Sequence, residues 1–419
     1  MIAASISLPE LLFGFIFVYP LFMAYLWMAG GLFYWFHYER RAGTPDRPPE
    51  LPSFPKVALV VPCYNEQDNV FETVSTLLLH EYPNFEVIAV NDGSSDSTAE
   101  VLDAMARIHP RLRVIHQARN QGKAVALNTA AVMTDAEFLV CIDGDALLDR
   151  NAARWMMWHM LHSSRVGAVT GNPRVRNRST LLGKIQVGEF SSIIGLIKRA
   201  QRTYGRLFTV SGVVGAYRRA ALHDVGYWSK EMMCEDIDIS WKLQMKHWDV
   251  RLEPAALCWI LMPETFRGLW RQRLRWAVGG MQVMFKFLPP MACWRMRRMW
   301  PVYAEYIVSV LWAYCFAVSI GLWVAGYLVE MPGPWRIPSV IPTWPGMVIA
   351  TSSLFQVAVG MFLDRRYDLR FGRQFYWVIW YPLAFWMITF ATAVVALPKA
   401  ALRTRGKRAL WTSPDRGHR

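Results

Sequence analysis

An uncharged apolar run near the start of the chain constrains the fold more than any other feature of the sequence. Residues 11–36 are 26 consecutive residues without a charged side chain, and Phe, Leu, Trp and Tyr are frequent among them. About 20 apolar residues are enough for a helix to cross a bilayer. The run is too long for the apolar part of a cleaved signal peptide, and no Lys or Arg precedes it. The sequence therefore predicts a transmembrane helix over residues 8–36 that the protein retains.

Three further apolar segments near the C-terminus are each long enough to cross a membrane, namely 300–329, 343–363 and 375–397. The composition agrees with several membrane segments, because 53% of the residues are hydrophobic and only 19% are charged. Glu305 lies within the first of these segments. Since an acid that faces lipid is costly, we expect Glu305 to lie near the membrane interface or to face a polar cavity. We predict three transmembrane segments within residues 300–397.

The positions of basic residues predict the orientation of these segments. Four Lys or Arg residues follow the first segment within 37–56 and none precedes it, so the N-terminus is expected outside and the next domain in the cytosol. Three later crossings would place the tail, 398–419, outside. That tail holds seven Lys or Arg residues and one acid, which favours the inside. Either the last segment, which Pro382 interrupts, does not cross completely, or the tail departs from the charge preference.

The polar region 37–286 has the pattern of one α/β domain. Short apolar runs at 56–62, 85–90, 113–116 and 138–142 predict strands, and they alternate with predicted helices at 67–80, 98–108 and 123–133. Such alternation predicts a mostly parallel sheet whose ligands bind beyond the carboxyl ends of the strands. Two basic amphipathic stretches, about 180–204 and 264–298, are expected at the membrane interface, although the first has equally the pattern of a core helix.

The cysteines and the net charge exclude other classes of protein. Six cysteines are scattered without a C-x-x-C pair, which argues against a zinc site and a disulfide framework and for buried thiols in a reducing compartment. The formal net charge of +14 is concentrated beside the apolar segments and forms no recognisable nucleic-acid-binding motif. We therefore expect no nucleic-acid partner.

Polar side chains follow three of the predicted strands. Tyr64 and Glu66 follow the first and Asp92 follows the second, and such groups suit a nucleobase and a ribose, although Asn, Asp, Gly and Ser also end strands in ordinary turns. Asp143 and Asp145 follow the strand at 138–142. Because two neighbouring carboxylates repel one another, this pair favours a site for Mg²⁺ or Mn²⁺ that phosphate oxygens of a substrate complete.

Two later motifs and one helix start carry further candidate residues. Lys123 begins a predicted helix and is placed to hold an anion, although the spacing of a P-loop is absent. Asp236, after Glu235, is placed to cap a helix or to act as a catalytic base, and spacing alone favours the cap. Gln272, Arg275 and Trp276 share one helical face, where a guanidinium can bind a pyrophosphate and an indole can stack on a sugar. The same basic helix is also suited to rest on anionic lipid.

These motifs together resemble the signature D, DxD, [TE]D and QxxRW of the processive family 2 glycosyltransferases. The matching positions are Asp92, Asp143-x-Asp145, Glu235-Asp236 and Gln272-x-x-Arg275-Trp276. Segments such as VPCYNE, VIAVNDGS, LVCIDGDALLDR and EDIDISWKLQ resemble, within that family, the bacterial poly-β-1,6-N-acetylglucosamine synthases. Hyaluronan, chitin and cellulose synthases resemble the chain through the signature and the fold. Cys234 stands where relatives often have Thr, and one N-terminal span is present where some relatives have two.

The resemblance implies a GT-A-type domain inserted between transmembrane helices in the bacterial inner membrane. It implies processive, inverting transfer of N-acetylglucosamine from UDP-N-acetylglucosamine, with Mg²⁺ or Mn²⁺, to a growing β-1,6-linked polysaccharide of biofilms. It also implies that this synthesis is coupled to export. It assigns uridine to Tyr64, Glu66 and Asp92, the nucleotide to Asp143, an anion to Lys123, the metal to Asp145, catalysis to Asp236 with Glu235, the diphosphate to Arg275, and the acceptor sugar to Gln272 and Trp276. A small membrane partner subunit and activation by cyclic di-GMP are also implied, although no separate domain accounts for the latter.

Other functions remain compatible with parts of this pattern. The same signature would occur in a non-processive membrane enzyme that glycosylates a lipid. It would also occur in a synthase of another polysaccharide such as hyaluronan or chitin. A transporter or nucleotide-sensing scaffold with an inactive transferase domain is disfavoured, because Asp145 and Asp236 are both present.

Overall fold

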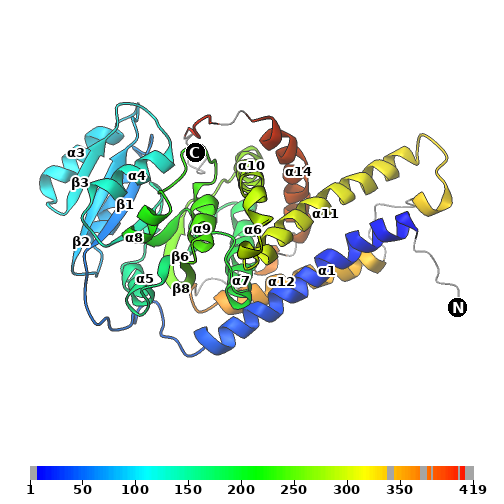
Figure 1. The fold of residues 1–419 in the computed structure, drawn as a ribbon, viewed down its shortest axis with the longest axis horizontal. Coiled ribbons are helices and arrows are strands. Elements are labelled where there is room, and N and C mark those ends of the chain that lie inside the picture. The colour runs from blue at the N-terminus through cyan, green and yellow to red at the C-terminus, as the bar shows by residue number, and fades with distance from the viewer. Residues whose placement is uncertain (1–6, 337–343, 369–374, 379–380, 404–405, 411–419) are drawn as a thin grey trace.

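The computed structural model describes residues 7–336, 344–368, 375–378, 381–403 and 406–410. At the centre of this described part lies an eight-stranded mixed sheet in the order β3-β2-β1-β4-β7-β6-β8-β5 (Figure 1). Its strands are β1 (Val57–Cys63), β2 (Phe85–Asn91), β3 (Leu112–His116), β4 (Phe138–Ile142), β5 (Leu147–Leu148), β6 (Val166–Val175), β7 (Val214–Arg218) and β8 (Asp249–Ile260). Strands β1 to β4 are parallel, and β7 is antiparallel to both neighbours, β4 and β6. The predicted α/β class is confirmed.

Helices cover both faces of the sheet, which explains the continuous apolar runs of its central strands. They are α2 (Val70–Leu78), α3 (Thr98–Ile108) and α5 (Ala152–Leu161) on one face, and α4 (Lys123–Met133), α8 (Arg219–Asp224) and α9 (Glu235–Met245) on the other. Every residue of β1 and β4 is buried, and alternate residues of β1 pack into the two different clusters. The four strands and three helices predicted between 56 and 142 are confirmed, with small differences at their ends.

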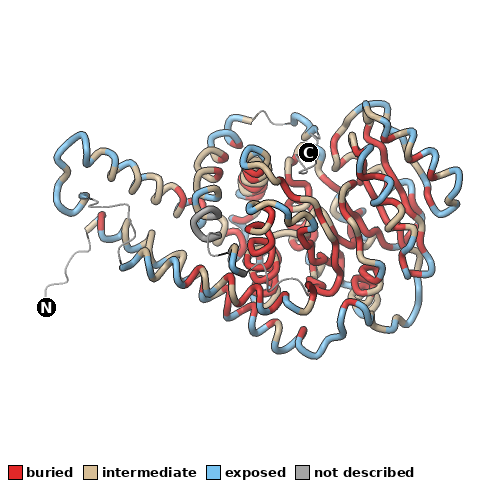
Figure 2. Tube along the Cα trace, turned by 180° about the vertical axis from the view of Figure 1, so that it is seen from behind, coloured by how far each residue is buried: buried red, intermediate tan, exposed pale blue. Residues whose placement is uncertain are grey.

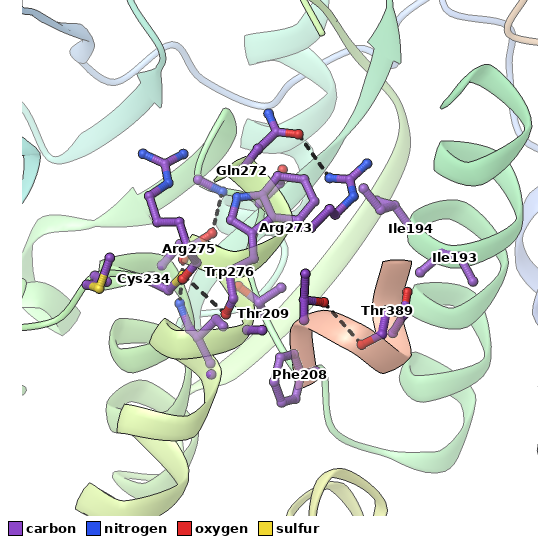
Figure 3. A pocket seen from close by; sticks show the side chains of 18 of the residues that line it. Ile193, Ile194, Phe208, Thr209, Cys234, Gln272, Arg273, Arg275, Trp276 and Thr389 are labelled. Carbon is purple, nitrogen blue, oxygen red and sulfur yellow. Dashed lines mark hydrogen bonds between the residues drawn. The ribbon is translucent and has the colours of Figure 1, made fainter. Parts of the chain in front are cut away.

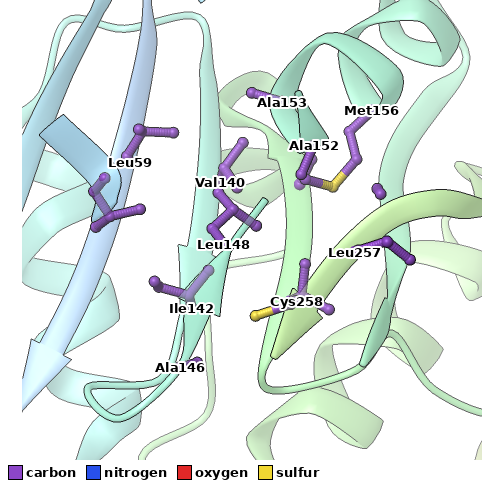
Figure 4. Packing of buried hydrophobic residues seen from close by; sticks show 14 of the residues in the cluster. Leu59, Val140, Ile142, Ala146, Leu148, Ala152, Ala153, Met156, Leu257 and Cys258 are labelled. Atoms are coloured by element: carbon purple, nitrogen blue, oxygen red, sulfur yellow. The ribbon is translucent and has the colours of Figure 1, made fainter. Parts of the chain in front are cut away.

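A compact part of this core lies under the turn that follows β4. Ile142, Leu148, Ala152, Met156 and Cys258 are all buried in one cluster (Figure 4). They come from β4, β5, α5 and β8, so four elements pack around the turn that carries the predicted acidic pair. Buried apolar contacts of this kind hold a backbone in one conformation.

Three long helices extend together from one side of the sheet domain (Figure 1). They are α1 (Leu8–Tyr34), which continues as a π-helical turn (Trp35–Glu39), α11 (Trp300–Ala325) and α12 (Trp344–Asp364). Each is long and apolar enough to cross a membrane, and Figure 2 shows that most of their residues are not buried within the protein. They coincide with three of the four predicted membrane segments. Glu305 of α11 accepts a hydrogen bond from Gln201 Nε2 at 3.3 Å.

Within the fourth predicted segment, 375–397, the structure describes α13 (Phe375–Val378) and α14 (Tyr381–Leu402). Helix α14 packs along α10 (Phe266–Met291). Beyond α14, the backbone N–H of Ala409 donates to the carbonyl of Lys230 at 3.0 Å. Residues 406–410 of the basic tail therefore lie beside the sheet domain, whereas 411–419 lie outside the described residues.

The amphipathic stretch 180–204 lies at the junction of the sheet domain and the long helices. It forms α6 (Leu181–Glu189), a π-helical turn (Phe190–Gly195) and α7 (Leu196–Tyr204), and α7 packs along α1. Arg199 of α7 donates to both carboxylate oxygens of Glu39, at 2.6 and 2.8 Å, and its Nη1 lies 2.9 Å from Asp364 Oδ1. All three side chains are buried. These ion pairs join α7 to the ends of α1 and α12.

The six cysteines are free, and four of them are buried as expected. Cys315 is partly buried and Cys293 is exposed. Short 3₁₀ turns at Trp294–Met296 and Gly333–Trp335 flank α11.

We expect the substitution Arg199→Met to lower the free energy of unfolding by about 3–5 kcal/mol, because it removes the ion pair of the buried Glu39 carboxylate and one of the two ion pairs of Asp364, which keeps Arg174. The melting temperature of the detergent-solubilised protein measures this loss. Arg202, on the same helix, pairs with Asp249 at 2.9 Å where both side chains contact solvent. Arg202→Met is the control and should cost about 1 kcal/mol or less. Equal losses in the two variants would contradict the assigned importance of the junction.

Candidate active site

One cavity of about 700 Å³ connects the carboxyl ends of the strands with the long apolar helices. Motifs that are far apart in the sequence converge on its walls. The predicted site residues that line it are Glu66, Lys123, Asp143, Asp145, Glu235, Asp236, Gln272, Arg275 and Trp276. This convergence follows from the topology, because parallel strands bring their carboxyl ends to one edge of a sheet.

The ammonium group of Lys123 contacts carboxylates from two of the acidic motifs. Its Nζ donates to Asp143 Oδ1 at 2.5 Å and to the carbonyl of Gly212 at 2.8 Å, and it lies 3.2 Å from Glu235 Oε1. Burial opposes the charged form of Lys123, but the attraction of Asp143 and Glu235 outweighs burial and raises its pKa above the usual value. The ammonium group is therefore positively charged and ties the turn after β4 to the start of α9.

Asp236 is the second residue of α9, so its expected role as the helix cap is wrong. The cap position belongs to Cys234, whose side chain makes no capping hydrogen bond. Asp236 Oδ2 instead accepts the backbone N–H of Gly212 at 3.0 Å. Burial, followed by repulsion from Glu235, raises the pKa of Asp236 to about 6, although Lys123 acts in the opposite direction. A carboxylate that titrates near neutral pH is suited to general-base chemistry.

Gln272, Arg275 and Trp276 lie together on one wall of the cavity (Figure 3). Arg273, between them in sequence, is buried and donates to Glu189 Oε2 at 2.7 Å. Its Nη1 donates to Gln272 Oε1 at 3.0 Å, and its guanidinium carbon lies 4.2 Å from the centre of the Trp276 ring. Arg273 therefore orients both the amide and the indole.

Glu189 and Arg273 are not among the predicted site residues, and Arg273 belongs to the basic helix for which contact with anionic lipid is predicted. A signal for the pair was present, because Glu189 is the only acidic residue within 180–204. An isolated acid in a basic, apolar stretch requires a buried partner, and the partner lies in the next basic helix.

Cys234 joins the start of α9 to helix α10. Its Sγ lies 3.9 Å from the carbonyl oxygens of both Arg275 and Trp276. A Cβ atom at Gly279 of α10 would lie 2.3 Å from this sulfur atom. Cys234 therefore fills the contact between the start of α9, which carries Asp236, and the helix that carries Trp276.

Asp92 and Tyr64 do not line the cavity, unlike the other predicted site residues. Asp92 is completely buried, and its two carboxylate oxygens accept the backbone N–H groups of Gln121 and Gly122, each at 2.8 Å. Burial raises the pKa of Asp92 in spite of these two donors. Gly122 has a φ of +93°, a conformation that favours glycine. Asp92 thus shapes the turn that presents Lys123.

Asp145 is the first candidate for a metal ligand, since it lines the cavity in the turn after β4 and its neighbour Asp143 is paired with Lys123. No group of three or more His, Cys, Asp and Glu side chains is placed to hold a metal ion within the described residues. Mg²⁺ in nucleotide sites commonly uses one or two carboxylates, with phosphate oxygens and water as its remaining ligands. The donor set fits a cation that binds together with a phosphorylated substrate.

The other end of the cavity lies among the apolar helices. Tyr19 of α1, Ser309 and Trp312 of α11, and Trp386 and Thr389 of α14 line this end. The hydroxyl groups of Tyr19 and Ser309 lie 2.5 Å apart, and the two indole rings meet edge to face with centres 5.4 Å apart. Aromatic faces with interspersed hydroxyl groups form a surface that is partly apolar and partly able to form hydrogen bonds.

Comparisons with known proteins agree with this arrangement. A family model described as "Glycosyltransferase like family 2" matches residues 55–279. The chain is 37% identical over 411 residues to "Poly-beta-1,6-N-acetyl-D-glucosamine synthase" of Staphylococcus aureus (strain MSSA476), which covers 97% of this chain and 98% of the relative. It is 36% identical over 407 residues to the protein of the same name from Staphylococcus epidermidis, with the same coverage.

The fold is also similar to that of a solved structure. A mannosyltransferase from Pyrobaculum calidifontis, in complex with GDP-Man and Mn²⁺, superposes with a TM-score of 0.62 and 20% sequence identity. The similarity covers 92% of this chain and 98% of the other. It extends to the helices outside the sheet domain as well as to the sheet itself.

Proposed function

The chain belongs to glycosyltransferase family 2, and we propose that it transfers N-acetylglucosamine from UDP-N-acetylglucosamine to a growing β-1,6-linked poly-N-acetylglucosamine chain. It is a glycosyltransferase with a GT-A-type fold. The single observation that carries the proposal is the cavity in which Asp145 and Asp236 lie at one end and the apolar helices at the other. The name shared by the staphylococcal relatives supports the sugar and the linkage.

The donor is proposed to bind at the acidic end of the cavity. From the cavity wall, Glu66 contacts the uridine, Asp143 contacts the nucleotide, and Arg275 binds the diphosphate. Tyr64, outside the lining, contacts the uridine where the base extends beyond the cavity. Asp92 acts on this site through the turn that it holds before Lys123. Asp145 would hold Mg²⁺ or Mn²⁺, and such a cation, when bound, offsets the negative charge that develops on UDP as it departs.

The acceptor is proposed to bind between Asp236 and the wall formed by Gln272 and Trp276. Asp236 accepts the proton of the acceptor 6-hydroxyl group, and the oxygen atom attacks the anomeric carbon from the side opposite UDP. The bond between that carbon and the UDP oxygen breaks, which inverts the configuration. Arg275 stabilises the charge on the leaving group, and Glu235 contributes by holding Lys123.

The membrane arrangement that we propose has α1, α11 and α12 crossing the bacterial inner membrane, with the sheet domain in the cytosol. Helix α14 then lies along α10 without a full crossing, since Ala409 behind it contacts Lys230 of the sheet domain. This arrangement brings the basic tail to the cytosolic side, where its charge favours it. Of the two alternatives given for the tail, this arrangement is the one in which the last apolar segment does not cross the membrane completely.

Synthesis is proposed to be processive and coupled to export. The apolar end of the cavity, with Trp312 and Trp386, would receive the polymer as each sugar is added. Indole faces suit the apolar faces of sugar rings, and hydroxyl groups such as that of Tyr19 suit their edges. The small membrane partner subunit and activation by cyclic di-GMP stay predictions.

Incorporation of radiolabel from UDP-N-acetylglucosamine by purified membranes with Mg²⁺ tests the proposed function. We expect a product of high molecular mass that a β-1,6-N-acetylglucosaminidase degrades, and we expect it inside inverted sealed vesicles. A labelled lipid of low mass would identify a non-processive enzyme instead. Polymer that stays outside the inverted vesicles would contradict coupling to export while leaving the transfer reaction established.

A further inference from the structure

Lys198 of α7 is a buried cation in the cavity wall that the mechanism above does not use. Its side chain is only 6% exposed, and it lines the cavity near Ser211 and Gly212. Its Nζ donates to Thr170 Oγ1 at 3.1 Å. An ammonium group has three N–H donors, and a single neutral hydroxyl compensates poorly for removing its charge from water.

The neighbouring residue on α7 shows how this chain compensates a buried cation that has a structural role. Arg199 has the carboxylates of Glu39 and Asp364 within ion-pair distance. Lys198 forms no ion pair with a carboxylate in the described part of the chain, where its hydrogen bond goes to Thr170. Its charge therefore does not serve the junction between α7 and the long helices.

Hydrogen bonds to two consecutive residues of one loop, Ser211 and Gly212, connect the Lys198 side to the Asp236 side. Thr170 Oγ1, which accepts from Lys198, also accepts the backbone N–H of Ser211 at 2.9 Å. The next N–H group, that of Gly212, donates to Asp236 Oδ2 at 3.0 Å. Burial lowers the pKa of Lys198 to about 8, and the attraction of Asp236 acts in the opposite direction. The two groups thus face each other across one strand-end turn.

Other charged or titratable groups surround Asp236 as well. They are Glu235 on its own helix, Lys123 from α4, Cys234 before α9, Tyr217 from β7 and Arg275 from α10. Lys123 forms ion pairs with Asp143 and Glu235 and is also the stronger of the two lysines that lower the pKa of Asp236, with Lys198 as the second. Lys198 has no such competing acid among the described residues.

We propose that Lys198 is a positioning residue of the transfer reaction, whose ammonium group keeps Asp236 ionised and donates hydrogen bonds to the acceptor sugar beside it. An acceptor hydroxyl group that donates its proton to Asp236 is then held from a second side, because a neighbouring sugar oxygen accepts from Lys198. This inference rests on the proposed role of Asp236 as the base. It gives the acceptor a fixed direction of approach to Asp236.

The test compares three variants in a transfer assay with a short β-1,6-linked acceptor oligosaccharide, with kcat and KM measured from pH 5.5 to 9. The wild-type kcat is expected to fall at low pH as Asp236 is protonated and at high pH as Lys198 loses its proton. Lys198→Met should move the acid limb to higher pH by about one unit and raise the acceptor KM about tenfold. Lys198→Arg should restore activity at pH 7 and abolish the alkaline limb, because a guanidinium stays protonated.

Lys184→Met is the matched control, since Lys184 lies in the same amphipathic stretch with its Nζ 4.7 Å from the centre of the Trp377 ring and does not line the cavity. Its pH profile and acceptor KM should equal those of the wild type. A proportional loss at every pH in Lys198→Met, together with a lower melting temperature, would show that Lys198 is structural and overturn the proposal. If that variant fails to fold, an unchanged alkaline limb in Lys198→Arg overturns it instead.

Different results contradict the proposed function and the role of Lys198. A wild-type chain that transfers no sugar from UDP-N-acetylglucosamine contradicts the proposed function. An active wild type whose profile is shared by the Lys198 variants contradicts only the role of Lys198.

Discussion

The substitution Asp236→Asn is expected to lower the rate of sugar transfer by about 10²–10⁴-fold, the range that a positioned general base contributes. Asparagine keeps an oxygen that can accept the N–H group of Gly212, so the start of α9 should keep its shape. Binding of UDP-N-acetylglucosamine should be unchanged, because the acidic groups assigned to the donor remain. Initial rates and equilibrium binding of the donor, measured on the same preparation, separate these two effects.

The buried carboxylate of Asp238 provides the control for this substitution. It lies two residues further along α9 and accepts from Lys286 Nζ at 2.6 Å and from Ser229 Oγ at 2.6 Å, away from the cavity. Asp238→Asn should therefore lower the melting temperature and leave the rate per folded molecule unchanged. Wild-type turnover in Asp236→Asn would remove Asp236 from the role of base.

Much of the fold was predictable because its first half is built from strongly patterned segments. Strand β4 is a buried apolar run followed at once by Asp143, and both the strand and its turn are read directly from neighbouring residues. The same holds for α10, where the spacing of Gln272, Arg275 and Trp276 already defines one helical face. The structure confirms that these residues share a cavity with Asp236.

The features that sequence reasoning missed depend on contacts between distant segments. Spacing favoured Asp236 as a helix cap, since that role needs only local residues, whereas its actual partner, Gly212, arrives from the loop before β7. Arg273 has the sequence neighbourhood of a lipid-facing residue until Glu189, from another helix, is known to lie 2.7 Å away. Burial of Lys198 is equally invisible locally, because α1 and the sheet domain together enclose α7.

The packing of the last apolar segment has a similar origin. Hydropathy alone describes 375–397 as one possible crossing. Packing of α14 along α10, and the return of Ala409 to Lys230, come from tertiary contacts that a window of hydropathy does not contain.

The substitution Asp145→Asn is expected to lower the apparent affinity of the enzyme for Mg²⁺ by about 100-fold or more. Even groups that only orient metal ligands contribute about 10–100-fold to metal affinity, and a direct ligand should contribute at least as much. Its oxygen atom remains but its charge is lost, and a hard divalent cation selects for that charge. The dependence of the initial rate on Mg²⁺ concentration measures this change during turnover. Electron paramagnetic resonance of Mn²⁺ binding in the presence of UDP measures it without turnover.

Asp149→Asn is the matched control, because the Asp149 side chain does not line the cavity. It accepts the N–H group of Asn151 at 3.0 Å, which an asparagine side chain can also do. An unchanged Mn²⁺ affinity in Asp145→Asn would assign the cation to Asp143. Asp143 would then have to release Lys123 before it binds the cation. In that case the double variant Lys123→Met/Asp145→Asn would bind Mn²⁺ more tightly than Asp145→Asn alone.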